Sequence, residues 1–377
     1  MHGIKRLSSG RWQARYFAGL DKAGKRIYPS KSFLLQADAI KWRRDRIHEK
    51  ESGRPADSLE LIVDAYLDRW LEDKKTRVGY HTLHAYTNTC RLYIRPMFGL
   101  RRLRSLEPLD IQNWQRQLLE KISAHSVSDA RNIFRMALKD AVSLRLIAFS
   151  PMAGTVAPKW EKNEMKTFTQ EQARIFLSYC KPDRWGVLFN LLLMTGLRPG
   201  EAQGLCWSAL DLPGARVRVR QVVIARGVQG WVFGPPKTGR SKREVAMPAS
   251  LVTKLSEHRR RQLEERMAAG SAYEQHDLVF ANAGGGPLLT NAIAVNFKKL
   301  LRAAELPNMR VYDLRHSFCT LSLLAGIDLK TVSSDMGHAS VAFTLDNYGH
   351  VLESMREGAA QRREEMFGNQ SAAGGKK

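Results

Sequence analysis

The chain has 377 residues, 44% of them hydrophobic, which exceeds the size of one ordinary core and excludes wholesale disorder. No apolar run is long enough to span a membrane, and four widely spaced cysteines without a CxxC pair favour buried thiols in a cytoplasmic protein. The net charge of +23 favours nucleic acid as the partner, because neutralised phosphates release counterions and the basic residues gather on no single membrane-binding face.

Residues 1–57 carry the densest positive charge of the chain, with 14 Lys and Arg against 6 Asp and Glu. Their aromatic-rich segments 11–17 and 25–33 are predicted to be short strands, joined by a turn at 21–24. A helix is predicted to follow and to end at Gly53. Its inner face is predicted to consist of Ala37, Ile40 or Trp42, and Ile47.

After a predicted linker at 54–56, residues 58–165 show the periodicity of four amphipathic helices, enough to bury one small core. Their apolar and aromatic residues recur at helical spacing in four groups: Leu59, Ile62, Tyr66 and Trp70; Leu83, Tyr86, Cys90 and Ile94; Ile111, Trp114 and Leu118; Ala130, Phe134, Leu138 and Val142. Periodicity is lost over the Pro-, Gly- and Lys-rich residues 150–166, which are predicted to be a second linker.

A larger domain is predicted over 166–367, followed by a disordered tail at 368–377. Thr169 and Gln172 have the spacing of a capping box, and a buried helix is predicted to end at Gly196. The segments VRVRQVVI, WVF and REVAMP are predicted to be strands of one small sheet, with GPPKTGRS as the turn before the last strand. Helices are predicted from residue 250 onward.

The larger domain lacks the common metal, nucleotide and hydrolase motifs, because GxxxxGK[ST], HExxH, GxSxG and clustered carboxylates are all absent from the sequence. It instead contains TGLRPGE at 195–201, PPKTGR at 235–240, YDLRHSF at 312–318 and GHASVAFTLDNYGH at 337–350. Taken singly, each polar residue in these motifs is more simply explained as a solvated charge, a structural histidine or a packed tyrosine.

Together, these polar residues are sufficient to cut a phosphodiester without a metal ion. Arg198 and Arg315 can each give bidentate hydrogen bonds to the non-bridging oxygens of one phosphate, and His338 can give a further one. Lys237 can protonate the leaving alkoxide. The phenol of Tyr348 is a weak nucleophile at its ordinary pKa of about 10, which cationic neighbours lower. Such a cut holds the bond energy as a phosphotyrosine.

The four motifs resemble the boxes of the tyrosine recombinase family, the lambda-type integrases, over most of residues 168–360. The resemblance implies two arginines that clamp the phosphate, a general acid on a hairpin, the histidine of a Gly-His box, a nucleophile and an acidic residue that orients the pocket. In that order, the residues that match are Arg198 and Arg315, Lys237, His338, Tyr348 and Glu201.

One position departs from the family's pattern, because Tyr312 stands where the family usually has histidine, three residues before the second arginine. A phenol there can hydrogen-bond a phosphate oxygen, but it is a poor proton acceptor near neutral pH. His316 is a candidate substitute. Since adjacent residues of a helix point apart, we interpret it as structural.

The upstream domains also resemble the family: residues 58–165 its helical core-binding domain, and residues 1–57 its small three-stranded arm-binding domain. The resemblance implies a multidomain α+β fold, in which a mainly helical catalytic domain carries a small antiparallel sheet. A basic sheet with Trp12, Tyr16 and Tyr28 could instead read RNA by stacking. The basic and aromatic residues expected to contact DNA are Lys5, Arg6, Arg11, Trp12, Arg15, Lys25 and Arg26.

The function implied by the resemblance is site-specific DNA recombination by the integrase of a prophage or similar mobile element, through a 3′-phosphotyrosyl intermediate. No cofactor is implied, because bond energy is conserved. The implied partners are double-stranded DNA at core and arm sites, other copies of the chain in a homotetramer, a DNA-bending host protein and a directionality factor.

Two rival functions remain open from the sequence. A type IB topoisomerase shares the tyrosyl chemistry, and a repressor or decayed integrase would bind DNA without cutting it. The arm-like N-terminal domain argues against the first rival. The segment after Tyr348 is expected to dock on a neighbouring protomer. Its packing residues are predicted to be Val351, Met355 and Met366.

Overall fold

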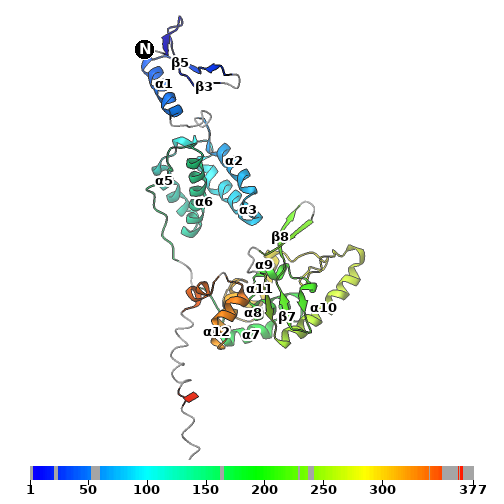
Figure 1. Ribbon diagram of the computed structural model, residues 1–377. Coiled ribbons are helices and arrows are strands. Elements are labelled where there is room, and N and C mark those ends of the chain that lie inside the picture. Colours follow the sequence, from blue (N-terminus) through cyan, green and yellow to red (C-terminus); the bar gives the residue numbers. More distant parts are fainter. Residues whose placement is uncertain are drawn as a thin grey trace, which may run out of the picture. The chain divides into compact units, whose positions relative to one another are not determined.

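The computed structural model has a mixed architecture, as predicted, in which helices predominate and the antiparallel sheets are small (Figure 1). The chain divides into two compact units, one over residues 1–162 and the other over residues 163–377. Among the described residues, no helix is both long and apolar enough to cross a membrane. The structure describes residues 3–20, 24–51, 60–161, 165–227, 230–236, 242–338 and 340–349, together with residues 364, 366 and 367.

A three-stranded antiparallel sheet with the order β1-β2-β5 begins the first unit and confirms the predicted sheet. Its strands are β1 (Ile4–Arg6), β2 (Trp12–Arg15) and β5 (Ser30–Phe33), beside a hairpin of β3 (Gly19–Leu20) and β4 (Arg26–Ile27). The helix α1 (Gln36–Glu51) packs against β2 and β5, where Ala14 is fully buried. The sequence does not reveal β1, because a three-residue strand leaves no periodicity to detect.

The inner face of α1 differs from the predicted one. Ala37 and Ile40 are exposed, whereas Ala39 is fully buried and Trp42 faces the sheet. The largest side chain of the helix sets its rotation, because the Trp42 ring packs at centroid distances of 5.7 and 5.9 Å against Tyr16 and Phe33. Most of the predicted turn at 21–24, the helix end at Gly53 and the linker at 54–56 lie outside the described residues.

Four helical segments follow in the first unit, as predicted, and one of them contains a π-helical turn over Cys90–Ile94. Rings of Phe98, Trp114 and Phe134 meet in their core at centroid distances of 5.4 to 5.8 Å. The helices are α2 (Val63–Lys75), α3 (Tyr80–Thr89), which continues through the π turn into α4 (Arg95–Phe98), then α5 (Pro108–Leu119) and α6 (Ala124–Ser143).

The predicted linker at 150–166 is wrong over its first residues. Met152 is buried in the core of the helical segments. Arg131 of α6 donates hydrogen bonds to the carbonyl and hydroxyl oxygens of Thr155, at 2.7 and 3.0 Å. These contacts hold the segment against the helices despite its Pro and Gly content, and residues 162–164 lie outside the described part.

The second unit is built around α8 (Arg184–Thr195), which is buried along most of its length and confirms the predicted buried helix. Both α10 (Ala249–Ala269) and α12 (Asp313–Leu324) pack against it. The capping box at Thr169 is also confirmed, because Thr169 and Gln172 exchange hydrogen bonds of 3.1 and 3.0 Å. The remaining helices are α7 (Gln170–Tyr179), α9 (Pro199–Gln203), α11 (Thr290–Ala303), α13 (Leu329–Met336) and the helical residues 341–349.

The strands of the second unit form two separate sheets, so the prediction of a single sheet is wrong. One sheet has the order β10-β7-β6, and β8 pairs with β9 in a hairpin that projects from the unit (Figure 1). The chain leaves the first sheet at Val219, whose N–H bonds the carbonyl of Arg243 at 2.9 Å, so VRVRQVVI is divided between both. The strands are β6 (Leu210–Asp211), β7 (Arg216–Arg218), β8 (Val222–Gly227), β9 (Gly230–Gly234) and β10 (Glu244–Ala246).

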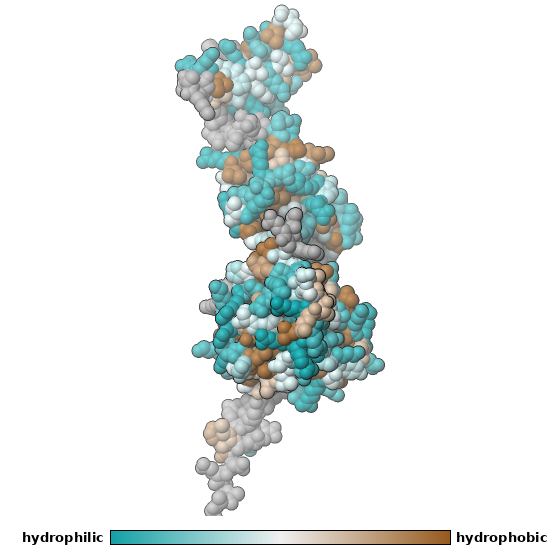
Figure 2. Space-filling view, turned by 90° about the vertical axis from the view of Figure 1, so that its right-hand side faces the viewer, coloured by the Kyte–Doolittle hydropathy of each residue, from teal (hydrophilic) through white to brown (hydrophobic). Residues whose placement is uncertain are grey.

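The cysteines and the surface agree with what the composition predicts. All four cysteines are free, as predicted, and three of them are buried. Hydrophilic residues cover most of the face of the second unit that Figure 2 shows, with smaller hydrophobic areas between them. The predicted tail at 368–377 lies outside the described residues.

Candidate active site

The turn between α8 and α9 presents Arg198. α8 ends at Gly196, whose φ of 63° lies in the left-handed region that favours glycine. A Cβ added at Gly196 would also lie 2.4 Å from the ring of Phe318, so this turn requires glycine. Arg198 is the N-cap residue of α9, with Pro199 in the first helical turn, and its side chain is 33% exposed.

Arg315 reaches the same turn from α12. Its Nη1 donates a hydrogen bond of 2.5 Å to the carbonyl of Gly196, and its Nη2 donates to the carbonyl of Met336. The side chain is almost fully buried. Burial, together with the positive charge of Arg198, lowers the pKa of Arg315 to about 10. The fold therefore brings two guanidinium groups near each other, at an electrostatic cost that an anion would relieve.

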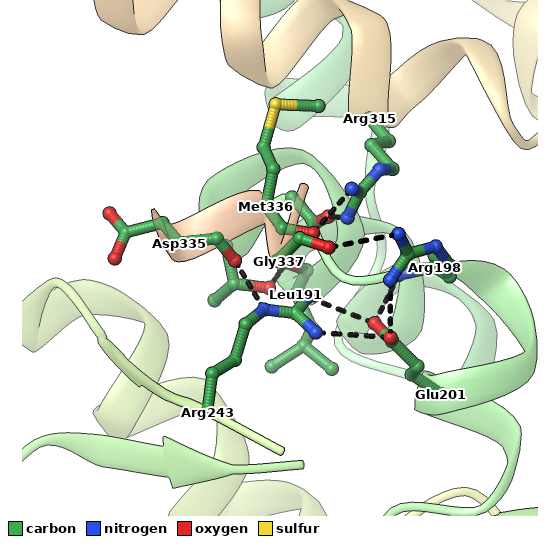
Figure 3. Close-up of polar contacts among 10 residues, drawn as sticks. Leu191, Arg198, Glu201, Arg243, Arg315, Asp335, Met336 and Gly337 are labelled. Carbon is green, nitrogen blue, oxygen red and sulfur yellow. Dashed lines mark hydrogen bonds and ion pairs between the residues drawn. The ribbon is translucent and has the colours of Figure 1, made fainter. Parts of the chain in front are cut away.

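The C-terminal end of α13 collects three arginines (Figure 3). The carbonyls of three consecutive residues, Asp335, Met336 and Gly337, accept hydrogen bonds from three different guanidinium groups. The donors, in that order, are Arg243 at 2.5 Å, Arg315, and Arg198 at 3.3 Å. The last carbonyls of a helix lack intrahelical donors and carry the negative end of its dipole, which is why cations bind there.

Glu201 joins two of these arginines. Its carboxylate accepts hydrogen bonds of 3.0 and 2.9 Å from Arg243 and one of 2.8 Å from the side chain of Arg198. Burial alone would raise the pKa of this carboxyl, but the hydrogen bonds and charge of Arg243, with those of Arg198, lower it overall. Glu201 is therefore a buried carboxylate that holds the guanidinium of Arg198 in place.

Arg243 is the residue of this network that the sequence does not single out. It lies just before β10, among other arginines that pair on the surface, and its own side chain is only 6% exposed. Its partner Glu201 is 42 positions earlier in the chain. The one available signal is that Arg243 follows Lys237 by six residues, between two of the four motifs.

Changing Arg243→Leu is expected to destabilise the protein by about 3 kcal/mol, because it leaves a buried carboxylate with half of its charge partners removed. Urea unfolding measures the loss. Arg218→Leu is the matched control, because Arg218 forms an ion pair with Glu244 in which both side chains are over a third exposed. That change should cost far less stability than Arg243→Leu, because solvent screens an exposed ion pair. An Arg243→Leu variant as stable as the control would contradict this account of the network.

His338 follows the left-handed residue Gly337 and lies beside the same arginines. Its Nδ1 lies 2.8 Å from the hydroxyl oxygen of Thr344, and its ring meets the ring of Phe343 edge-on. Burial, and then the charges of nearby arginines, chiefly Arg315, lower the pKa of His338 to about 4. The imidazole is therefore neutral near pH 7, and its Nε2 can donate one hydrogen bond to a phosphate oxygen when the proton is on that nitrogen.

The lowered pKa of His338 predicts a pH dependence of stability. The unfolded imidazole has a pKa of about 6.5, so between pH 6.5 and about 4 the unfolded chain binds more protons at this position than the folded one. The free energy of unfolding should therefore fall as the pH is lowered through this window. His338→Gln should lose that part of the fall, which urea unfolding at pH 7 and pH 5 would measure. An unchanged pH dependence in the variant would contradict the prediction.

Tyr348 is 2% exposed, and its ring packs in a small apolar cluster with Cys319 and Met336. Its hydroxyl oxygen lies 2.5 Å from Nδ1 of His316. Burial, with the neighbouring Cys319 thiol, raises the pKa of Tyr348, whereas the charge of Arg315 lowers it. Among the described residues, the hydroxyl contacts His316 and Cys319 and forms no hydrogen bond with a guanidinium group. The phenol is thus stored protonated, within the electrostatic range of Arg315.

The structure therefore brings together Arg198, Arg315 and His338, and Tyr348 is buried within the electrostatic range of Arg315. Tyr312 is 42% exposed and meets the ring of His316 edge-on, at a centroid distance of 5.3 Å. The contact of His316 with the Tyr348 hydroxyl goes beyond the structural role expected from the sequence. Lys237 lies outside the described residues, as do residues 238–241 of its turn and the packing residues Val351 and Met355; Met366 is described, and is exposed.

The N-terminal residues expected to contact DNA lie on and around the small sheet. Trp12 is half-buried under the guanidinium of Arg6, at 6.0 Å from the ring centroid, and Arg15 lies over the ring of Tyr28. All six charged residues of the set are exposed, including the two that lie over rings: Lys5, Arg6, Arg11, Arg15, Lys25 and Arg26.

Known proteins resemble the chain over almost its whole length. A tyrosine recombinase XerC-like protein of Caldanaerobacter subterraneus subsp. tengcongensis is 26% identical, over 93% of this chain and 94% of the relative. An integrase of Streptomyces ambofaciens is 27% identical, over 90% and 89% of the two chains. The Tn1549 transposon integrase, solved with a circular intermediate DNA, superposes with a TM-score of 0.66 at 19% identity, over 79% of this chain and 99% of the other.

Family models give the same answer and cover both units. Residues 63–119 match the phage integrase N-terminal SAM-like domain. Residues 163–355, half of the chain, match the phage integrase family. The chain therefore belongs to the phage integrase family and is a tyrosine-type site-specific recombinase.

Proposed function

We propose that the protein integrates and excises a prophage or similar mobile element by cutting and rejoining DNA with Tyr348. The phenol oxygen attacks a backbone phosphate, which leaves a 3′-phosphotyrosyl bond and a free 5′-hydroxyl. The 5′-hydroxyl of a partner strand then attacks the phosphotyrosine and releases the enzyme. The observation that supports this most is the pair of guanidinium groups, Arg198 and Arg315, held on the adjacent carbonyls of Gly337 and Met336.

The two arginines are the phosphate clamp of this proposal. A guanidinium has five N–H donors. Two nitrogens of Arg198 and two of Arg315 donate side-chain hydrogen bonds to carbonyl or carboxylate oxygens, so further donors remain for non-bridging oxygens. Neutral His338 gives a third contact, and Lys237 protonates the leaving 5′-oxygen. Charge that develops at phosphorus is met by donors already fixed in the fold.

Tyr348 has to move for this chemistry. Its hydroxyl is buried against His316 and Cys319, whereas the clamp faces the carbonyls at the end of α13. Residues 341–349 form a short helix after Gly337, and a shift of this helix would bring the phenol oxygen to a bound phosphate. We propose that DNA binding causes this shift, because a phosphate on the clamp competes for the guanidinium groups of Arg198 and Arg315 with the carbonyls of Gly337 and Met336, which precede this helix.

We propose that each domain has a different role in binding DNA. We assign residues 1–57 to an arm-type DNA-binding domain, residues 58–165 to a core-binding domain and residues 166–367 to the catalytic domain. The charge of residues 1–57 and their exposed Lys and Arg side chains support the first assignment. A lambda integrase dimer has been solved on a core site and a tetramer on a Holliday junction, and both share this fold at TM-scores of 0.57 and 0.58.

By analogy with these assemblies, we propose a homotetramer on double-stranded DNA at core and arm sites, because exchange of strands between two duplexes needs four active sites. A DNA-bending host protein and a directionality factor complete the proposed partners. The protein would act on the nucleoid in the cytoplasm.

A nicked suicide duplex, built from the sequences that flank the gene, tests the proposed function. Cleavage beside the nick releases a short strand, so religation fails and the covalent complex accumulates. We expect a protein–DNA band that survives SDS and disappears after protease treatment. The assay is repeated with duplexes made from each flanking sequence and from the junction that excision would create. Binding to these duplexes without a covalent band would contradict the proposal and favour a DNA-binding protein that does not cut.

A protein truncated after Gly349 tests the proposed docking of the C-terminal segment. It should still bind single sites, because the clamp and both DNA-binding domains are intact. We expect it to lose the complex of two duplexes in gel filtration, because the segment with Val351, Met355 and Met366 would no longer reach a neighbour. Unchanged synapsis by the truncated protein would contradict the docking.

A further inference from the structure

His316 lies at the reacting atom of the proposed chemistry. It follows Arg315 on α12, and this one-residue step turns its side chain to a different element. Arg315 contacts Gly196 and Met336, whereas Nδ1 of His316 lies 2.5 Å from the hydroxyl oxygen of Tyr348. Both side chains of α12 therefore serve one site, the first at the phosphate clamp and the second at the nucleophile.

The contact matters because the phenol must lose its proton before or during attack. Tyr348 is 2% exposed, so water cannot readily take that proton. Burial also raises the pKa of this phenol above its ordinary value, which increases the demand for a base. An imidazole nitrogen that is in hydrogen-bond range of the phenol oxygen, and that carries a lone pair, meets this demand.

The other titratable groups around the phenol are poor bases. Arg315 is a cation, and burial raises the pKa of the Cys319 thiol to about 12, so the thiol keeps its own proton. The ring of Tyr312 carries another phenol. His338 has a pKa lowered to about 4, and its Nδ1 is occupied by Thr344. The described groups that face His316 and Tyr348 from the elements packed around them are Tyr312, Arg315, Cys319 and His338.

We propose that His316 is the general base that takes the proton of Tyr348, a role that rests on the proposed function. While the phenol still lies against His316, before residues 341–349 shift, its O–H bond breaks and the proton moves to Nδ1 of His316. The phenolate oxygen bonds to phosphorus, and the bond from phosphorus to the 5′-oxygen breaks. That oxygen takes its proton from a separate acid, which the proposed function identifies as Lys237. In the reverse step, His316 returns the proton to the departing tyrosine.

The same hydrogen bond could instead be a latch that keeps the phenol buried. The two roles differ in sign, since removal of a base slows cleavage and removal of a latch accelerates it. They also respond differently to the acidity of the phenol. A more acidic phenol needs less help from a base, whereas a latch or a merely structural histidine is insensitive to that acidity.

The test measures single-turnover formation of the covalent complex on the nicked suicide duplex, from pH 6 to pH 9. Wild type is compared with His316→Gln and His316→Ala, each also prepared with 3-fluorotyrosine at position 348. His276→Gln is the matched control, because His276 is a partly exposed histidine paired with Glu274 in the same unit. Urea unfolding and DNA affinity of each variant are measured alongside, to separate lost chemistry from lost fold.

We expect His316→Gln to slow the reaction by about 10²-fold at pH 7 while His276→Gln leaves it unchanged. The loss should shrink as the pH rises and shrink further with the fluorinated tyrosine. Added imidazole should partly restore His316→Ala. A rate for His316→Gln equal to or above wild type overturns the inference, as does a loss that neither pH, fluorination nor imidazole alters. Failure of wild type itself to form the complex contradicts the proposed function, and this role falls with it.

Discussion

Replacing Tyr348 by phenylalanine is expected to abolish covalent capture of DNA while leaving the affinity for DNA unchanged. The change removes one oxygen, which is the proposed nucleophile, and keeps the ring that packs beside Cys319 and Met336. Loss of a nucleophile costs at least about 10⁴-fold in rate. The affinity should persist because the phosphate contacts come from arginines. SDS-resistant complexes on the suicide duplex, and gel shifts of an intact duplex, measure the two quantities.

The control for this variant is Tyr179→Phe, at the exposed C-terminal end of α7. Tyr348→Phe also removes the hydrogen-bond partner of His316, which should cost about 1 kcal/mol of stability. The protein therefore remains folded in the assay. If Tyr348→Phe still captured DNA covalently, another residue would be the nucleophile, and the proposed mechanism would be wrong.

Arg198→Ala is expected to have the second largest effect, a loss of cleavage by about 10²- to 10³-fold, because one donor group of the transition state disappears. Its effect on non-specific binding should be small, since one phosphate contact lowers the slope of log affinity against log salt by about 1. Arg198 is a cleaner probe than Arg315. The Arg198 side chain is 33% exposed, whereas removal of the buried Arg315 would leave two carbonyls without their donors.

Two further variants make the Arg198 result specific. Arg302→Ala removes an exposed arginine of α11 and should leave cleavage intact. Arg198→Lys keeps the charge but loses the planar fork, so cleavage should remain well below wild type. Full recovery by lysine would show that charge alone suffices at this position. Cleavage by Arg198→Ala at the wild-type rate would remove Arg198 from the proposed clamp.

The rival functions give different outcomes in the same assays. A type IB topoisomerase would relax a supercoiled plasmid that lacks the attachment site, and a recombinase should require that site. A protein that only binds DNA would be unaffected by Tyr348→Phe in every assay. The rivals therefore need no additional variants.

The sequence by itself determined the residue types of the site and the order of the helices. Three short motifs contain Arg198, Arg315, His338 and Tyr348, because each side chain needs a specific local backbone, such as the left-handed turn at Gly196. Helices of the first unit were predictable because their apolar spacing is regular. The pairing of the strands was less predictable, because VRVRQVVI is continuous in sequence but its two halves pair in different sheets.

Only the tertiary structure decided which neighbours these residues have. Arg243 and Glu201 are 42 positions apart, and His316 and Tyr348 are 32 apart, so no local pattern joins either pair. The rotation of α1 depended in the same way on where the Trp42 ring met the sheet. The physical reason is that local sequence sets backbone conformation and periodicity, whereas the burial and partner of a charged or titratable side chain depend on packing between distant segments.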